Sequence, residues 1–161
     1  MGINANGLGE RSAWTSYMDA WTAHDPAAVV GYMTDDVVYI DLGVGERMDG
    51  RSAVSEFAAS MQPNFSSDYR FDLGRVVIDG DSFAAEWTMS GTHDGEDEQR
   101  GLPATGRRFE IAGVSVGRLR DGKIAENKDY YNLASFLMQV GLMPAPETAP
   151  ALPGQQVDAG G

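Results

Sequence analysis

The second half of the chain is a succession of β-type runs, and this feature restricts the possible folds most strongly. The runs cover residues 69–78, 82–92, 107–119 and 123–131, and they are rich in the β-branched and aromatic residues that strands favour. The segment IDGDS joins the first pair, and RDGK joins the last pair. Because Asp-Gly is typical of tight turns between antiparallel strands, the four runs are predicted to form a meander.

The first half of the chain has the apolar spacing of helices. From about Leu8 to His24, large apolar residues recur at the spacing of an amphipathic helix. Asp25 and Pro26 then suit the cap and the first position of a second helix, which is expected to run to about Met33.

One further strand and two further helices complete the expected elements. A strand over residues 37–42 leads into a glycine-rich loop, and the segment SAVSEFAASM predicts a third helix. The last helix, LASFLMQVG, is expected to stop at Gly141, because glycine readily adopts the left-handed conformation that ends a helix.

This order of elements predicts an α+β fold. A curved, mostly antiparallel sheet is expected to wrap around the N-terminal helices as a cone that encloses a pocket. A single domain is predicted over residues 8–143. It would follow a flexible leader at residues 1–7 and precede a disordered tail, rich in Pro, Ala and Gly, at residues 144–161.

The composition excludes several kinds of site and partner. The chain has no cysteine and two histidines, and it lacks EF-hand and H-E-x-x-H spacings, a phosphate loop and a dinucleotide motif. No cofactor or metal is therefore predicted, although a carboxylate metal site stays open. The net charge of −12 disfavours nucleic acid, and no apolar run approaches the roughly 20 residues that span a bilayer. The N-terminal sequence lacks signal-peptide features, so a cytoplasmic location is expected.

Three polar residues stand where an apolar face is expected, and each has two interpretations. Asp41 ends a β-type run before glycines, so it either caps the turn or points into a pocket. Tyr17 lies on the apolar face of the first helix, either as a core tyrosine or as a hydroxyl donor. Asp129 lies either on the polar side of an edge strand, beside Lys128, or in a site as an acid/base group.

Other polar residues are weaker candidates. Glu86 and Thr88 share one face of the strand 82–92, and Glu86 either pairs with an arginine on a neighbouring strand, Arg75, Arg107 or Arg108, or belongs to the site. His93 is either a loop-edge side chain or a site residue, and the acidic residues that follow it are expected to form a solvated loop. Carboxylates, a tyrosine and a histidine, without a nucleophile motif, suit proton transfer without a cofactor.

The chain resembles the SnoaL-like polyketide cyclases of the nuclear-transport-factor-2-like superfamily. The resemblance extends over about residues 10–143 and is carried by YMTDDVVYIDLGVGERMDGRSAVSEF, GTHDG, LPATGRRF and RLRDGKIAENKDYYNLASFLMQVGL. It implies the cone-shaped fold and a homodimer. The acid/base aspartate of these cyclases corresponds to Asp129, while Lys128 and Asn132 replace the usual tryptophan and aspartate.

Two other members of the superfamily resemble parts of the chain. The stretch from Asp41 to Phe57 is similar to ketosteroid isomerase, which implies a general base at Asp41 and an oxyanion-binding hydroxyl at Tyr17. Ser115 stands where the isomerase has its second oxyanion donor, and where some cyclases have an assisting histidine.

Limonene epoxide hydrolase has an aspartate in a motif similar to KDYYN, and this aspartate again corresponds to Asp129. Its tyrosine and asparagine partners correspond to Tyr39 and Asp41. Its arginine and second aspartate would fall near Glu86 and Thr88, so the general acid and its orienting cation are missing.

Together, the residues and the resemblance predict a cofactor-free acid/base enzyme that acts on a small apolar carbonyl compound, polyketide-like or steroid-like, by aldol cyclisation or isomerisation. Asp129 is the expected acid/base, Asp41 a second base or orienting group, and Tyr17 the oxyanion donor. The expected secondary pocket residues are Tyr39, Glu86, Thr88, His93, Ser115, Trp14, Trp21 and Phe57. A non-catalytic protein that binds a hydrophobic ligand in the same cone is the first alternative, and an epoxide hydrolase is the second.

Overall fold

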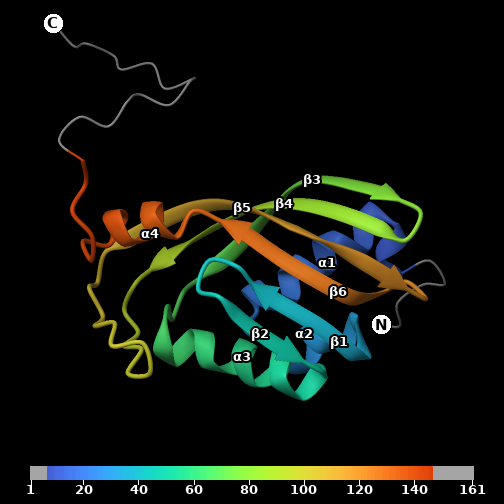
Figure 1. The fold of residues 1–161 in the computed structure, drawn as a ribbon, viewed down its shortest axis with the longest axis horizontal. Helices are drawn as coiled ribbons and strands as arrows, with labels where there is room; N and C mark the ends of the chain where they lie inside the picture. Colours follow the sequence, from blue (N-terminus) through green and yellow to red (C-terminus); the bar gives the residue numbers. More distant parts are fainter. Residues whose placement is uncertain (1–6, 147–161) are drawn as a thin grey trace, which may run out of the picture.

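Six strands form one mixed sheet in the computed structural model, which describes residues 7–146 (Figure 1). The strands are β1 (Met33–Asp41), β2 (Glu46–Asp49), β3 (Arg70–Asp79), β4 (Ser82–Thr92), β5 (Arg108–Arg120) and β6 (Lys123–Tyr131). Their order in the sheet is β2-β1-β6-β5-β4-β3. β1 and β6 pair in parallel, and all other neighbouring strands are antiparallel. β6 therefore lies in the interior of the sheet and not at an edge.

Four α-helices accompany the sheet within the described residues. They are α1 (Arg11–Thr22), α2 (Pro26–Gly31), α3 (Arg51–Asn64) and α4 (Leu133–Gln139), and a short 3-10 helix, η1 (Gly7–Gly9), precedes α1. In Figure 1, α1, α2 and α3 lie along one side of the curved, unclosed sheet, and α4 lies near the start of β5. The predicted α+β fold, with a curved sheet around the N-terminal helices, is confirmed.

The local sequence explains how these elements begin and turn. Asp25 caps α2 by accepting a hydrogen bond from the backbone N–H of Ala28 at 3.1 Å, and Pro26 occupies the first position. The β5–β6 hairpin turns through Asp121 and Gly122, whose φ angles are 52° and 73°. Asp-Gly is favoured in this turn because both positions need a positive φ.

The four strands predicted in the second half agree with β3 to β6 to within one residue at each end. The first half differs more. The first helix begins at Arg11, since Leu8 lies in η1, and the second ends at Gly31 because Met33 already starts β1. The glycine-rich loop was expected to have no strand, but it contains β2. Only Met48 of β2 is buried, so the four residues lack the alternation of apolar and polar residues that predicts a strand.

Aromatic side chains pack between α1 and the sheet. Trp14 is fully buried, and its ring packs against Phe83. Trp21 contacts the rings of Tyr39 and Phe57. Burial of each such ring stabilises the fold by about 2 kcal/mol, so this cluster fixes α1 against the concave face.

No helix within residues 7–146 has the length and hydropathy needed to cross a membrane. Residues 1–6 and 147–161 lie outside the described part of the chain. The predicted leader, tail and domain boundaries therefore stay predictions.

Candidate active site

A cavity of about 510 Å³ lies between the helices and the concave face of the sheet. All six strands and the helices α1, α3 and α4 contribute side chains to its lining. Most of these side chains are aromatic or aliphatic, which suits an apolar ligand. The buried polar residues of the lining are Asp41, His93, Ser115 and Asp129.

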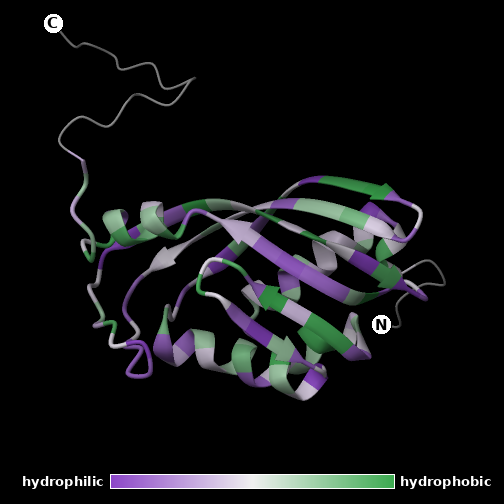
Figure 2. Ribbon diagram, viewed as in Figure 1, coloured by the Kyte–Doolittle hydropathy of each residue, from purple (hydrophilic) through white to green (hydrophobic). Residues whose placement is uncertain are grey.

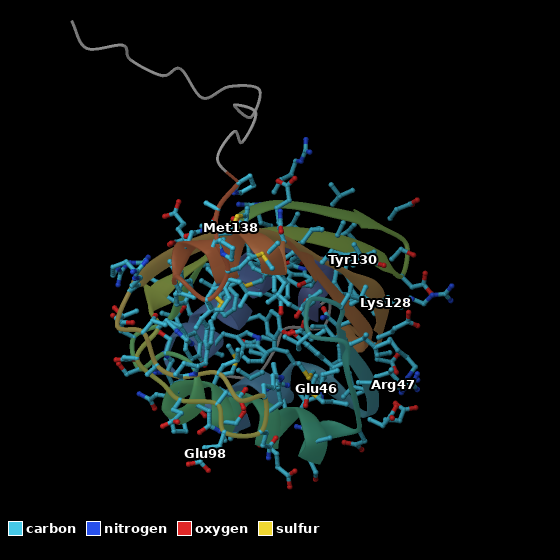
Figure 3. All side chains as sticks on the ribbon, turned by 60° about the vertical axis from the view of Figure 1, so that its left-hand side comes forward. Glu46, Arg47, Glu98, Lys128, Tyr130 and Met138 are labelled. Carbon is cyan, nitrogen blue, oxygen red and sulfur yellow. The ribbon has the colours of Figure 1, made fainter. Side chains whose placement is uncertain are left out.

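The strand β6 brings a polar face into this cavity. Figure 2 shows that most of β6 is hydrophilic, although the strand lies in the middle of the sheet. Lys128 and Tyr130 lie on its outer side (Figure 3), while the alternate residues Asn127, Asp129 and Tyr131 face inward. Asp129 and Tyr131 line the cavity, and Asn127 is completely buried.

Asp129 is a buried carboxylate, with 9% of its surface exposed, that is held by three hydrogen-bond donors. Ser115 Oγ and Asn127 Nδ2 donate to its Oδ1 at 2.6 and 2.8 Å, and the hydroxyl of Tyr39 donates to its Oδ2. Burial raises the pKa of Asp129 to about 6, although the three donors oppose this effect, and the nearby charge of Asp41 adds to it. The interpretation as a polar edge-strand residue is therefore excluded.

The hydroxyl of Ser115 is oriented from its other side. Trp87 Nε1 donates a hydrogen bond to Ser115 Oγ at 2.9 Å, so the serine proton is left to point at Asp129. Ser115 and Asp129 are paired residues on the antiparallel strands β5 and β6, which places their side chains on the same face.

Asp41 both caps the turn and lines the cavity, so the two interpretations that the sequence left open do not exclude each other. Its Oδ1 accepts hydrogen bonds from the backbone N–H groups of Gly43 at 2.9 Å and Val44 at 3.2 Å, so it caps the turn. The same oxygen accepts a hydrogen bond from the hydroxyl of Tyr131 at 2.8 Å. The side chain also lines the cavity, with 8% of its surface exposed.

Tyr17 and Tyr39 place two further hydroxyl groups at the cavity. Both side chains are buried. Burial raises the pKa of each phenol above its ordinary value, and the charge of Asp129 adds to this effect. Both hydroxyls therefore stay protonated at neutral pH and can donate hydrogen bonds.

Only some of the other predicted residues lie at the cavity. Trp21, Phe57 and His93 line the cavity, and Nδ1 of His93 lies 3.1 Å from Thr105 Oγ1. Burial lowers the pKa of His93, so its ring is neutral at pH 7. Trp14 packs in the core and is not part of the lining.

Glu86 and Thr88 do not line the cavity, which corrects the prediction that they belong to the pocket. They lie on the outer face of β4, because its inward positions are taken by the buried residues Trp87 and Met89. Glu86 forms an ion pair with Arg75 at 3.7 Å, which is the alternative that the sequence offered.

Asn127 and Tyr131 were not predicted as site residues, although Asn127 donates a hydrogen bond to Asp129 and Tyr131 donates one to Asp41. The period of two along β6, counted outward from Asp129, would have identified them. The loop between β4 and β5 was also expected to be only solvated. Its residues Asp97 and Arg100 line the cavity and form an ion pair at 2.6 Å, and Arg100 also pairs with Glu46 of β2.

No group of three or more His, Asp or Glu side chains within residues 7–146 is arranged to hold a metal ion.

The sheet, the helices and the enclosed site define a protein of the ketosteroid isomerase-like fold. A Catenulispora acidiphila protein with this fold, crystallised in complex with trimethylamine, superposes with a TM-score of 0.70 at 25% identity, over 80% of this chain and 91% of that chain. The model of the SnoaL-like domain family matches residues 14–127, and the chain belongs to that family. The predicted resemblance is thus confirmed.

Two of the proteins that this chain resembles are described as cyclases. Nogalonic acid methyl ester cyclase of Streptomyces nogalater is 29% identical over 92 residues, which are 57% of this chain and 67% of that protein. A Pseudomonas putida KT2440 structure assigned as a polyketide cyclase is 31% identical, with a TM-score of 0.67, over 86% of this chain and 98% of that chain.

Proposed function

We propose that this protein is a cofactor-free acid/base enzyme that removes a proton from a carbon next to a carbonyl group. The observation that carries the proposal is Asp129, a buried carboxylate with a pKa of about 6 at the wall of an aromatic cavity. A carboxylate with this pKa is ionised at neutral pH, and it binds a proton more strongly than an ordinary aspartate does. It is therefore suited to take a proton and return it.

In the proposed reaction, each of these residues has a separate role. Asp129 takes the proton from carbon, and the electron pair of the C–H bond moves to the carbonyl oxygen to form an enolate. Tyr17 donates a hydrogen bond to this oxygen, which it can do because burial keeps its phenol protonated. Tyr39, Ser115 and Asn127 hold Asp129 in place.

The enolate carbon then attacks a second carbonyl group of the same molecule and forms a carbon–carbon bond. The new alkoxide takes the proton back from Asp129, so the cyclisation balances without a co-reactant. Return of the proton to a different carbon would give an isomerisation instead. Similarity to the nogalonic acid methyl ester cyclase favours cyclisation of a polyketide-like compound. We also propose a cytoplasmic homodimer, on the basis of the family resemblance.

Epoxide hydrolysis has little support in this geometry. The positions on β4 that face inward beside Glu86 and Thr88 are Trp87 and Met89. Neither side chain supplies the acid or the orienting cation that such a reaction needs.

Ligand binding without chemistry is a second candidate, and the composition of the cavity favours it. Aromatic faces and buried carboxylates attract a small alkylammonium ion as well as a neutral apolar compound. The Catenulispora relative was crystallised with trimethylamine.

The proposal is tested by the proton-abstraction step alone. The exchange of the α-protons of 1-tetralone in D₂O is followed by NMR at pH 7 with wild type, Asp129→Asn and Asp79→Asn. Asp79 is an exposed residue of β3, so its variant is a control for the same chemical change. We expect wild type and the control to accelerate the exchange, and Asp129→Asn to lose about 10²-fold or more of this acceleration. Equal exchange with wild type and Asp129→Asn would reject the role of Asp129, and binding without exchange would favour the second candidate.

A further inference from the structure

Asp41 is hydrogen-bonded through only one of its two carboxylate oxygens. The N–H groups of Gly43 and Val44 and the hydroxyl of Tyr131 all donate to Oδ1, at 2.8–3.2 Å. No described residue donates a hydrogen bond to Oδ2. The side chain is 8% exposed and lines the cavity, so its free oxygen is available to a bound molecule rather than to bulk solvent.

The missing side chain at Gly43 creates the space that Tyr131 occupies. A Cβ atom on Gly43 would lie 2.1 Å from Cζ and 2.4 Å from the hydroxyl oxygen of Tyr131. The ring of Tyr131 also packs against Trp87, with 6.2 Å between the ring centroids. Tyr131 is thus fixed from two sides, and its hydroxyl fixes which oxygen of Asp41 is occupied.

Asp129 differs from Asp41 in this respect. Both of its oxygens accept hydrogen bonds, Oδ1 from Ser115 and Asn127 and Oδ2 from Tyr39. Of the two buried carboxylates that line the cavity, Asp41 is therefore the one with an oxygen that has no donor within the described residues.

We propose that Oδ2 of Asp41 forms a subsite that accepts a hydrogen bond from a hydroxyl group of the ligand. A carboxylate oxygen without a protein donor can accept from a bound molecule, and a ligand hydroxyl would give it a short, charge-assisted hydrogen bond. A neutral hydroxyl loses less solvation than an ammonium ion on entering an aromatic cavity, so it is the favoured donor. The inference rests on the proposed function, because it specifies the substrate as a carbonyl compound that also carries a phenol or enol hydroxyl.

The test compares two ligands that differ only in the donor. Binding of 2-naphthol and of its methyl ether, 2-methoxynaphthalene, is measured by calorimetry at pH 7. We expect wild type to prefer 2-naphthol by about tenfold or more, because one hydrogen bond to a charged group is at stake. In Asp41→Asn, the three donors hold the amide oxygen and turn the NH₂ group to the cavity. That variant should lose the preference, whereas the control Asp79→Asn should keep it.

The proposal fails if wild type shows no preference, if Asp41→Asn keeps the preference, or if the control Asp79→Asn removes it. Tighter, Asp41-dependent binding of 2-naphthylmethylammonium would overturn the choice of a hydroxyl. All of these results come from binding and not from turnover, so a failure of the α-proton exchange would leave the subsite standing.

Discussion

Asp41 and Asp129 are paired residues on the parallel strands β1 and β6, and both line the cavity. Paired residues on hydrogen-bonded strands lie about 5 Å apart, so each carboxylate feels the charge of the other. Only Asp129 is held by side-chain donors on both oxygens, while Asp41 is capped by the turn that follows β1. The two carboxylates are thus suited to different roles, and the effect of each on the other can be measured.

Asp41→Asn should lower the pKa of Asp129 from its value of about 6. The negative charge of Asp41 raises the pKa of its neighbour in addition to the larger effect of burial, and the substitution removes that charge. Carboxyl ¹³C NMR of aspartate-labelled protein would follow the titration. An unchanged or higher pKa would show that the charge of Asp41 does not raise the pKa of Asp129.

Ser115→Ala should change the same pKa in the opposite direction. The hydroxyl of Ser115 stabilises the ionised form of Asp129 at 2.6 Å, so its removal makes the charged form less favourable. Ser82→Ala, at an exposed position at the start of β4, is a matched control and should leave the titration as it is. A lower pKa in Ser115→Ala would contradict the hydrogen-bond assignment.

The α-proton exchange itself should depend on pH through Asp129. Because the base must be ionised, the rate should rise with pH through about 6 and level off above it. In Ser115→Ala the midpoint should move to higher pH, together with the NMR titration. If the midpoint of the rate profile differs from the pKa of Asp129 measured by NMR, a group other than Asp129 is the base.

The meander could be predicted from the sequence because its turns are local. Asp-Gly pairs at the hairpins specify both the turn and the register of the strands that follow, and β3 to β6 agree with the prediction. β2 could not be predicted, since pairing with β1 determines it and only Met48 is buried. Its strand character comes from a tertiary contact and not from its own residues.

The site was predictable only in part, for a related reason. Asp41, Asp129 and Tyr17 were selected as polar residues in apolar surroundings or by resemblance, and all three line the cavity. Glu86 and Thr88 were selected on the same ground, but a polar stripe on a strand most often faces solvent, as it does here. The pairing of Tyr131 with Asp41 is a contact between residues 90 positions apart, and sequence periodicity alone does not show it.

The stability of Asp129→Asn relative to wild type should be higher at neutral pH than at acidic pH. The folded pKa of Asp129, about 6, lies above its ordinary value of 3.8. The protonated Asp129 carboxyl of wild type therefore contributes to the unfolding free energy fully below about pH 4, and this contribution is lost as the pH rises through 6. Asparagine does not titrate. The difference in unfolding free energy, variant minus wild type, should therefore increase by up to about 3 kcal/mol between pH 4 and pH 7. Urea unfolding at both pH values measures it, and a constant difference would contradict the raised pKa.

Gly43→Ala should displace Tyr131 and release Asp41 from its hydroxyl. The new Cβ would lie 2.1 Å from the ring, which neither backbone nor ring can accommodate without moving, and overpacking of this kind costs about 1–3 kcal/mol. Gly31→Ala is the matched control, since a Cβ there meets no atom within 4 Å, and it should leave stability nearly unchanged. The cause is identified by repeating Gly43→Ala in a Tyr131→Ala background, where the clash is absent and most of the destabilisation should disappear. If Gly43→Ala costs the same in both backgrounds, the glycine is needed for the turn itself and not for the position of Tyr131.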